Sequence, residues 1–496
     1  MARYVMANRR AGKFHAEQKT ASRLALDAAF SANFDKSVDV VSDLNPPDIL
    51  ARRVMVIEAD PEEIAAKAPT LPTDVIVEPE ILHFPVSMMA GMRALAVLDL
   101  AAVPATTFNA TVTGGGSPLL GATVIVFARD AANRPHEIKQ VTDAAGMATV
   151  PLPAALTVVA LVVLPAGGFW SMVARNPVSG ITVDCPPIAD VGPLDWWHEL
   201  LGINAFDPNR GSGISVGVID SGARPHGCLA HVLSAGAFID GKHDPLGGDD
   251  VDSHGSHVCG TIGARPVTAL QRGGIAPGVT LICARVFPAP DTGATQADIA
   301  NAIDDLSRGR GVHLINMSLG APSPSAVEED AIRDALERGT LCVCAAGNDG
   351  GAVLWPARFD ETVAVSAIGR KKTAPAGSMS AGRVPPDPAK HGAEDLFLAS
   401  FSNFGSTIDC CAPGVGIIAT VPERFDLVEP YGVMDGTSMA SPVACGTLAA
   451  LLAQSETYKQ LTGSSRAEEA RAILRQNCRT IGLATIFQGN GMPRLP

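Results

Sequence analysis

The chain has 496 residues, a hydrophobic fraction of 47% and a formal net charge of −13 at neutral pH. This length exceeds one ordinary domain, and this hydrophobic content is enough for packed cores, which excludes wholesale disorder. The acidic balance argues against a nucleic-acid partner, because phosphate binding requires clustered Lys and Arg.

Residues 1–85 alternate strand and helix patterns, which predicts a small α+β unit of ferredoxin-like type. The second helix has a clear start signal, with Asp60 as N-cap and Pro61 at the first helical position. We expect strands at 3–10, 37–42, 52–59 and 74–84, and helices at 16–32 and 60–69. The N-terminal stretch carries positive charge but no apolar segment, so we expect no secretory signal.

Residues 86–103 are expected to form a linker, and the pattern changes after them. From 104 to 185, short strand patterns alternate with turn signals, which predicts an immunoglobulin-like β-sandwich. One stretch of this part, Val150 to Trp170, is apolar enough to suggest a membrane span. Prolines and glycines interrupt it, so we interpret its centre as a buried strand and expect no membrane partner.

From 190 to 496, apolar strand patterns alternate with helical segments. Strands this apolar are buried on both faces, so the alternation predicts an α/β domain built on a doubly wound parallel sheet. In such sheets the functional site lies outside the carboxyl ends of the strands. Asp220, Ser318 and Asn348 each stand at such an end.

Each candidate residue also has an ordinary structural interpretation. Asp220 precedes a turn, and Asn348 is a common turn residue. Ser438 opens an apolar helix and suits its N-cap, although unpaired N–H groups at a helix start also stabilise an attacking oxygen. His254 and His257 lie three residues apart but lack the third ligand of a zinc site, so we expect no metal there.

Taken together, these residue types favour acyl transfer. That reaction needs a nucleophile, a base that accepts its proton, an anion that holds the base, and a donor to the oxyanion. Ser438, His254, Asp220 and Asn348 supply these four groups, and the first three occur in the chain order Asp, His, Ser.

Five motifs resemble those of the subtilisin-like serine proteases, the subtilases. They lie within about 190–455 and read VGVIDSG, DSHGSHVCGTIG, NMSLG, AAGNDG and GTSMASPVACG. The resemblance implies that Ser438 is the nucleophile, His254 the general base and Asp220 the residue that orients it. It also implies that Asn348 and the backbone N–H of Ser438 hold the oxyanion.

The resemblance implies two substrate-binding segments, a strand that takes up extended peptide by strand addition and a wall of the pocket for the residue before the cleaved bond. They are Ser318, Leu319 and Gly320, and Ala345, Ala346 and Gly347, respectively. The chain departs from the usual motifs at Cys259, Val443 and Cys445, none of which is a catalytic position. An insertion at 371–395, rich in Pro, Gly and charge, is expected to be a surface loop.

The N-terminal unit resembles a subtilase propeptide, an inhibitor-like domain, most clearly in its last strand pattern at 74–84. In the family the propeptide usually joins the enzyme directly, so the intervening sandwich at 104–185 is a departure. It resembles carboxypeptidase-regulatory-type modules, and its role as a spacer or as a surface for a protein partner stays open.

No cofactor is required, but calcium stays open as a ligand. An acidic stretch offers an oxygen-rich cluster, or simply a solvated loop, with Asp240, Asp244, Asp249, Asp250 and Asp252. All ten cysteines lie at or after Cys185 without zinc spacing. Together with the missing signal they favour free thiols and a cytoplasmic location, with secretion by another route left open.

We therefore expect a serine endopeptidase that hydrolyses protein or peptide substrates through an acyl-enzyme on Ser438. The alternative is a latent or non-catalytic scaffold that its N-terminal domain holds shut, with the sandwich as binding module. An esterase that uses the same triad also remains open on chemical grounds.

Overall fold

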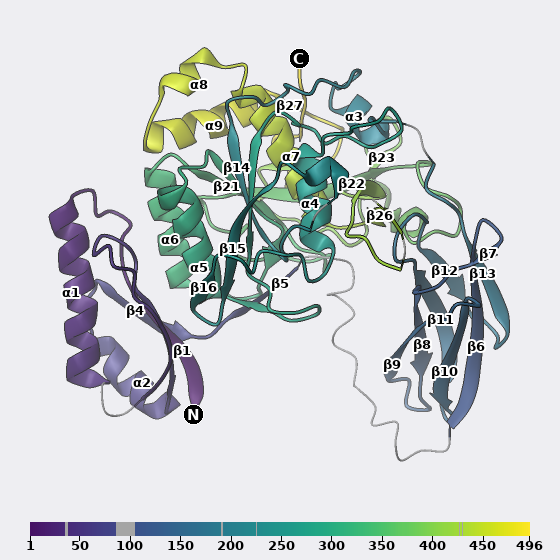
Figure 1. Cartoon of the computed structure of the whole chain (residues 1–496), viewed down its shortest axis with the longest axis horizontal. Coiled ribbons are helices and arrows are strands. Elements are labelled where there is room, and N and C mark those ends of the chain that lie inside the picture. The colour runs from purple at the N-terminus through teal and green to yellow at the C-terminus, as the bar shows by residue number, and fades with distance from the viewer. Residues whose placement is uncertain (35–37, 86–104, 190–191, 225, 426, 429) are drawn as a thin grey trace.

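The structure, a computed structural model, describes residues 1–34, 38–85, 105–189, 192–224, 226–425, 427–428 and 430–496. The linker expected at 86–103 lies outside the described residues. Figure 1 shows three parts: an N-terminal unit, a β-unit, and a large central domain between them. We use these names for residues 1–85, 105–185 and 192–496.

The N-terminal unit has a four-stranded antiparallel sheet in the order β2-β3-β1-β4. Alternation along β1 gives this sheet two apolar faces: Tyr4 and Met6 pack against the two helices, and Val5 and Ala7 pack toward the central domain. Its elements are β1 (Ala2–Asn8), α1 (Ala16–Asn33), β2 (Asp39–Leu44), β3 (Val54–Ala59), α2 (Pro61–Lys67), β4 (Val75–Pro79) and β5 (Leu82–Pro85).

The strand expected at 74–84 is wrong as a single element. Its first half, β4, stays in the sheet of the N-terminal unit, and its second half, β5, leaves that sheet and pairs with the central domain. The capping expected for α2 is confirmed, because the Asp60 side chain accepts a hydrogen bond from the Glu62 N–H.

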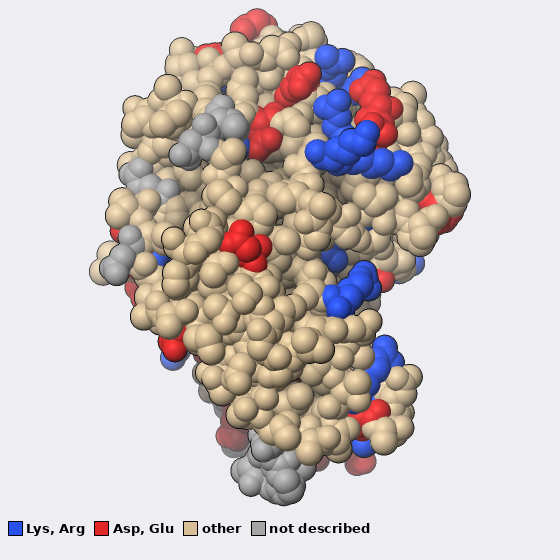
Figure 2. Space-filling model, turned by 90° about the vertical axis from the view of Figure 1, so that its right-hand side faces the viewer, with Lys and Arg blue, Asp and Glu red and all other residues tan. Residues whose placement is uncertain are grey.

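The β-unit consists of two four-stranded sheets around one apolar core. β11 occupies the centre of the apolar stretch at 150–170, as expected, and no helix among the described residues is long and apolar enough to cross a membrane. Figure 2, which views the molecule from this side, shows a mostly uncharged face. The strands are β6 (Ala105–Gly114), β7 (Ser117–Pro118), β8 (Thr123–Arg129), β9 (Pro135–Val141), β10 (Met147–Pro153), β11 (Thr157–Leu164), β12 (Met172–Arg175) and β13 (Ile181–Cys185).

The central domain is α/β, with a nine-stranded sheet in the order β16-β15-β17-β14-β19-β21-β22-β23 and with β24 also paired to β22. The predicted parallel sheet is corrected to a mixed one, because β16 and β23 run antiparallel to their neighbours. Both lie at the ends of the sheet. β16 follows β15 after a short turn, which suffices for an antiparallel neighbour, and β23 follows β22 after the insertion at 371–395. The strands are β14 (Ser215–Asp220), β15 (Leu233–Ile239), β16 (Lys242–Asp244), β17 (Thr280–Arg285), β18 (Ala294–Thr295), β19 (Leu314–Met317), β20 (Leu319–Gly320), β21 (Leu341–Ala345), β22 (Val363–Arg370), β23 (Leu396–Leu398), β24 (Cys410–Pro413), β25 (Ile417–Thr420), β26 (Tyr431–Met434), β27 (Cys478–Arg479) and β28 (Met492–Pro493).

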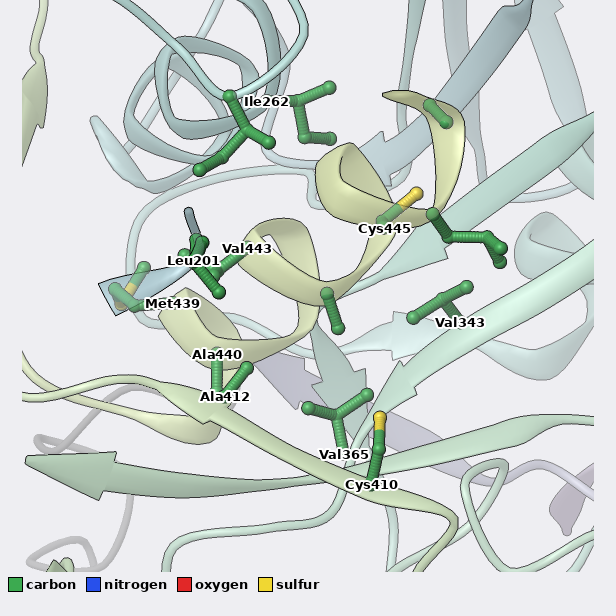
Figure 3. Close-up of a cluster of buried hydrophobic side chains, with 14 of the residues drawn as sticks. Leu201, Ile262, Val343, Val365, Cys410, Ala412, Met439, Ala440, Val443 and Cys445 are labelled. Carbon is green, nitrogen blue, oxygen red and sulfur yellow. The ribbon is translucent and has the colours of Figure 1, made fainter. Parts of the chain in front are cut away.

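Helices cover both faces of this sheet, as expected from its apolar strands (Figure 1). In β19, Leu314 packs into the core that contains α4 and α7, and Ile315 packs into the core that contains α5 and α6. All residues of α7 are buried, and Figure 3 shows its apolar side chains, including Cys445, packed among strands and α4. The helices are α3 (Trp196–Leu200), α4 (His254–Gly263), α5 (Gln296–Asp304), α6 (Ala326–Glu337), α7 (Thr437–Leu452), α8 (Glu456–Gln460), α9 (Ser464–Gln476) and α10 (Thr485–Gln488).

The insertion at 371–395 is not the simple surface loop expected from its composition. Ser378 and Ser380 are buried, and Ser378 forms an antiparallel bridge with Met172 of the β-unit. The insertion therefore joins the β-unit to the central domain.

Candidate active site

Asp220 and His254 are brought together where β14 ends and α4 begins. His254 Nδ1 lies 2.7 Å from Asp220 Oδ1, and both side chains are buried. Gly255 allows this approach, since a Cβ at that position would lie 2.1 Å from the carbonyl oxygen of Gly222. The glycine after His254 is therefore a steric requirement of the pair.

Asp250 holds the first turn of α4, a role that no local pattern in the sequence indicates. Its Oδ1 accepts hydrogen bonds from the N–H groups of Asp252 and Ser253 at 2.9 Å, and its Oδ2 accepts one from the Ser256 N–H at 2.9 Å. Ser253 has a φ of 94°, a left-handed conformation that only external contacts hold in a residue other than glycine. Asp250 thereby fixes the backbone that carries His254.

Ser438 is the second residue of α7 and is buried. Its Oγ donates to the Ser318 carbonyl at 3.1 Å, and the Ser318 Oγ donates to the Ser438 carbonyl at 2.9 Å. Asn316 and Ser441 join the same network, with Ser441 Oγ donating to Asn316 Oδ1 at 2.6 Å. The helix start and the carboxyl end of β19 are thus tied together in both directions.

Asn348 follows β21 and faces the residue before Ser438. Its Oδ1 accepts hydrogen bonds from the Thr437 N–H at 2.9 Å and the Thr437 hydroxyl at 3.0 Å. Since the carbonyl end of the amide is used in this way, its NH2 end is the one directed to other partners. Gly347 N–H donates to the same hydroxyl at 3.0 Å, which joins the expected wall Ala345, Ala346 and Gly347 to the start of α7.

Strand β5 of the N-terminal unit lies between β18 and β20 and pairs antiparallel with both. Figure 1 shows β5 at the central domain, away from the sheet of the N-terminal unit. Leu319 pairs with Pro85 and Gly320 with Phe84, so the expected substrate-binding strand already holds an extended segment. The strand on the other side of β5, β18, has only two residues, and no sequence pattern predicts it. Gln296 next to it binds the chain before β5, since its Oε1 accepts from the Ile81 N–H at 2.8 Å.

The charge around His254 favours its protonated form. Burial is the largest single influence and opposes that form, but the charge and hydrogen bond of Asp220, with the charges of Asp252 and Asp250, outweigh it and raise the pKa of His254 above its ordinary value. His257 is different, because burial lowers its pKa to about 3 and its Nε2 lies 3.0 Å from the Ile417 carbonyl. A neutral, hydrogen-bonded His257 is a structural residue.

The acidic stretch does not gather into a metal site. Within the part of the chain that the structure describes, no three or more His, Cys, Asp or Glu side chains converge as metal ligands. Asp250 is committed to the start of α4, and Asp240 lies in a turn with a positive φ of 51°. All ten cysteines have free thiols, and nine of them are buried.

Residues 211–491 match the sequence model of the Subtilase family. Subtilisin Savinase of Lederbergia lenta is 30% identical over 283 residues, covering 57% of this chain and 89% of that protein. The major intracellular serine protease of Bacillus subtilis (strain 168) is 31% identical over 295 residues, covering 57% of this chain and 81% of that protein. Among solved structures, a protease from Pseudoalteromonas arctica PAMC 21717 is 26% identical, with a TM-score of 0.47 over 58% of this chain and 89% of that chain.

Proposed function

Because this chain belongs to the subtilase family, it is a serine endopeptidase that acts on protein or peptide substrates, and we propose that Asp220, His254 and Ser438 form its catalytic triad. The observation that carries this assignment is the buried 2.7 Å contact between His254 Nδ1 and Asp220, at the start of a helix, α4, that packs against the helix of Ser438, α7. Treatment of the purified protein with a fluorophosphonate tests this assignment, because an unlabelled Ser438 would contradict it.

In this assignment Ser438 Oγ attacks the peptide carbonyl while His254 accepts its proton. Nδ1 of His254 faces Asp220, so Nε2 is the accepting atom. Ser438 Oγ has to exchange the Ser318 carbonyl for that nitrogen, and the N–H of an extended substrate on this strand is the group that can take over the carbonyl. The imidazolium then protonates the leaving amine, and water hydrolyses the acyl-enzyme.

Asn348 is proposed as the side-chain donor to the oxyanion, together with the Ser438 N–H. Asn348→Ala is expected to lower kcat by about 10²–10³-fold with little change in KM, because the donor acts mainly in the transition state. Steady-state kinetics on a peptide substrate measure both constants. Thr437→Val, which removes the hydroxyl that holds Asn348 Oδ1, is expected to show a smaller loss of the same kind. An unchanged rate for Asn348→Ala would mean that the oxyanion is held elsewhere.

The raised pKa of His254 gives a pH prediction. The base must be neutral to accept a proton, and a raised pKa keeps it protonated up to a higher pH. We therefore expect kcat/KM to fall on the acid side with an apparent pKa above about 6.5, the ordinary imidazole value. A pH profile of kcat/KM measures it, and an acid limb at or below that value would contradict the proposed environment of His254.

We further propose that residues 1–85 are a ferredoxin-like, propeptide-like domain that inhibits the enzyme. Its support is β5, which lies between β18 and β20 as an extended strand. This is where an extended substrate is expected to pair with the enzyme. Self-cleavage is then expected shortly beyond Pro85, because the β5–β20 register pairs Pro85 with Leu319 and runs toward Ser318. The Glu78 carboxylate strengthens the contact, because it accepts from the Ser325 hydroxyl and from the Ala326 N–H at 2.7 Å at the start of α6.

Buried ion pairs join the same two parts. Arg10 lies 3.2 Å from Asp334, and Arg52 donates to Asp304 at 3.1 Å and also to Asp330. Both arginine side chains are fully buried. Removal of one partner from such a cluster leaves an uncompensated buried charge, at a cost of about 3–5 kcal/mol.

Arg52→Gln is therefore expected to weaken the inhibitory contact and to raise the basal peptide hydrolysis of the purified protein severalfold. Arg3→Gln is the matched control, because Arg3 pairs at the surface with Glu58 of its own unit. Initial rates for the two variants and the wild type, with melting temperatures as a check on folding, make the comparison. Equal rates for Arg52→Gln and Arg3→Gln would contradict an inhibitory role of this interface.

The remaining assignments are also proposals. The β-unit is an immunoglobulin-like β-sandwich, and calcium is a ligand to test by its effect on the melting temperature. A cytoplasmic location is supported by ten free thiols, which suit a reducing compartment, and by a relative that is named intracellular. Cell fractionation would test it, and recovery of the protein from the medium of intact cells would support the alternative of secretion by another route.

A further inference from the structure

Asp435 stands three residues before Ser438 and has no part in the chemistry above. Its side chain is buried, and both carboxylate oxygens are used. Oδ1 accepts from the Ser380 hydroxyl and the Gly416 N–H, each at 2.7 Å, and Oδ2 accepts from Arg383 Nε at 3.1 Å. A buried carboxylate with these donors is held in one position. It fixes the backbone from which α7 starts.

Two of these three donors belong to the insertion at 371–395. Ser380 and Arg383 are the first and last residues of a short 3-10 helix in it. Arg383 is held as well, because its carbonyl accepts from the Ser400 N–H at 2.9 Å and its guanidinium lies over the Phe401 ring at 5.7 Å. The support of Asp435 thus comes from a segment that sequence composition assigns to the surface.

The β-unit holds this segment through backbone hydrogen bonds. Met379 N–H donates to the Ser171 carbonyl at 2.9 Å, and Val173 N–H donates to the Gly377 carbonyl at 3.0 Å. The Trp170 ring of the β-unit lies close to Gly416, which is itself a donor to Asp435. A Cβ placed on Gly416 would lie 3.5 Å from this ring. A continuous path therefore leads from the β-unit through the insertion to the residue that precedes the helix of Ser438.

Side chains of the β-unit add to this link at one place, where Met172 lies next to Gly377. A cavity of about 690 Å³ separates the segment from the outer face of β8 and β11. Its lining includes Ile125, Phe127 and Val162 on the sheet and Met379 on the insertion. The hydrogen bonds between the segment and the β-unit lie at one edge of this sheet, at and next to β12.

We propose that Asp435 is a positioning residue for the nucleophile, and that the β-unit acts on catalysis by holding Ser380 and Arg383 against it. The proposal rests on the proposed role of Ser438. The β-unit then supports the active site. When the insertion loses its contact with the β-unit, the reactivity of Ser438 falls, while the substrate-binding strand stays unchanged.

Four variants test the pair itself. Arg383→Gln and Asp435→Asn are each expected to lower kcat and the rate of fluorophosphonate labelling about tenfold with unchanged KM, because one charge-assisted hydrogen bond is lost in each. The double variant is expected to lose no more than either single one, since both remove the same interaction. Arg383→Lys is expected to recover part of the loss. Independent losses that multiply in the double variant would contradict the proposed pair.

A fifth variant tests the path to the β-unit. Met379→Pro removes the N–H that donates to Ser171, and the φ of −58° at this position suits proline. Met379→Ala is the matched control, because it shortens the same side chain but keeps the N–H. We expect Met379→Pro to resemble Arg383→Gln in kcat, KM and labelling, and Met379→Ala to stay within about twofold of wild type.

The outcomes separate the two proposals. The positioning path is supported if the wild type labels at Ser438, if Met379→Ala keeps the wild-type rates of turnover and labelling, and if Met379→Pro loses them. If Met379→Pro labels and turns over at the wild-type rate, or if Met379→Ala loses as much as Met379→Pro, the path is overturned while the proposed triad stands. If the wild type itself does not label at Ser438, the proposed function fails first.

Discussion

Ser438→Ala is expected to lower kcat by about 10⁶-fold while the fold stays intact, the size of loss known for removal of a triad nucleophile. The change removes the attacking oxygen and one hydrogen bond, to the Ser318 carbonyl, which is worth about 1 kcal/mol of stability. Turnover of a peptide substrate and the melting temperature of the same samples measure the two effects separately.

Ser441→Ala is the control for this change. Ser441 lies in the first turn of the same helix, is equally buried, and donates to Asn316 at 2.6 Å, but its hydroxyl has no chemical role in the proposed mechanism. It is expected to keep turnover within about tenfold of wild type. Normal turnover by Ser438→Ala, or an equal loss in both variants, would remove Ser438 from the nucleophile's position.

Asp220→Asn is expected to lower kcat by about 10⁴-fold. The amide keeps the volume of the carboxylate, but it neither favours the Nδ1–H tautomer of His254 nor stabilises the imidazolium. The loss of the charge also lowers the pKa of His254, so the acid limb of kcat/KM should move to lower pH. Kinetics across pH measure both changes in one variant.

Asp252→Asn separates these two effects. Asp252 raises the pKa of His254 by its charge but has no hydrogen bond to it among the described contacts. We expect a smaller shift of the acid limb in the same direction and a kcat close to that of wild type. A loss of kcat in Asp252→Asn as large as that in Asp220→Asn would contradict the special role given to Asp220.

Much of the central domain could be predicted because its strands are buried on both faces. That burial makes β14, β19 and β21 mostly apolar, so the polar residues at or just after their carboxyl ends stand out at the sheet edge. Asp220 and Asn348 were found in this way, and Ser438 by the small residues before an apolar helix. The antiparallel strands β16 and β23 were missed because three residues carry too little pattern to show a direction.

The residues that support the site could not be predicted, because their roles depend on long-range contacts. Asp250 and Asp435 have the pattern of acidic turn residues, yet both are buried. Asp250 accepts a hydrogen bond from the distant Ser221 besides those from its own loop, and all three donors to Asp435 come from distant segments. The pattern at 74–84 is continuous in sequence, and only the pairing of β5 with β18 and β20 shows that the chain leaves one sheet for another. The insertion at 371–395 has the composition of a surface loop, but its Ser380 and Arg383 side chains bind the buried Asp435.

The most direct measurement is intact and peptide mass spectrometry of purified wild type and Ser438→Ala after treatment with a fluorophosphonate. We predict that the wild type carries the label on Ser438 and has been cut shortly beyond Pro85, and that the variant is unlabelled and uncut. A wild type that is labelled but uncut would support the proposed triad and contradict the proposed self-cleavage. An unlabelled wild type, or a label on another serine in both proteins, would contradict the assignment of Ser438 as the nucleophile.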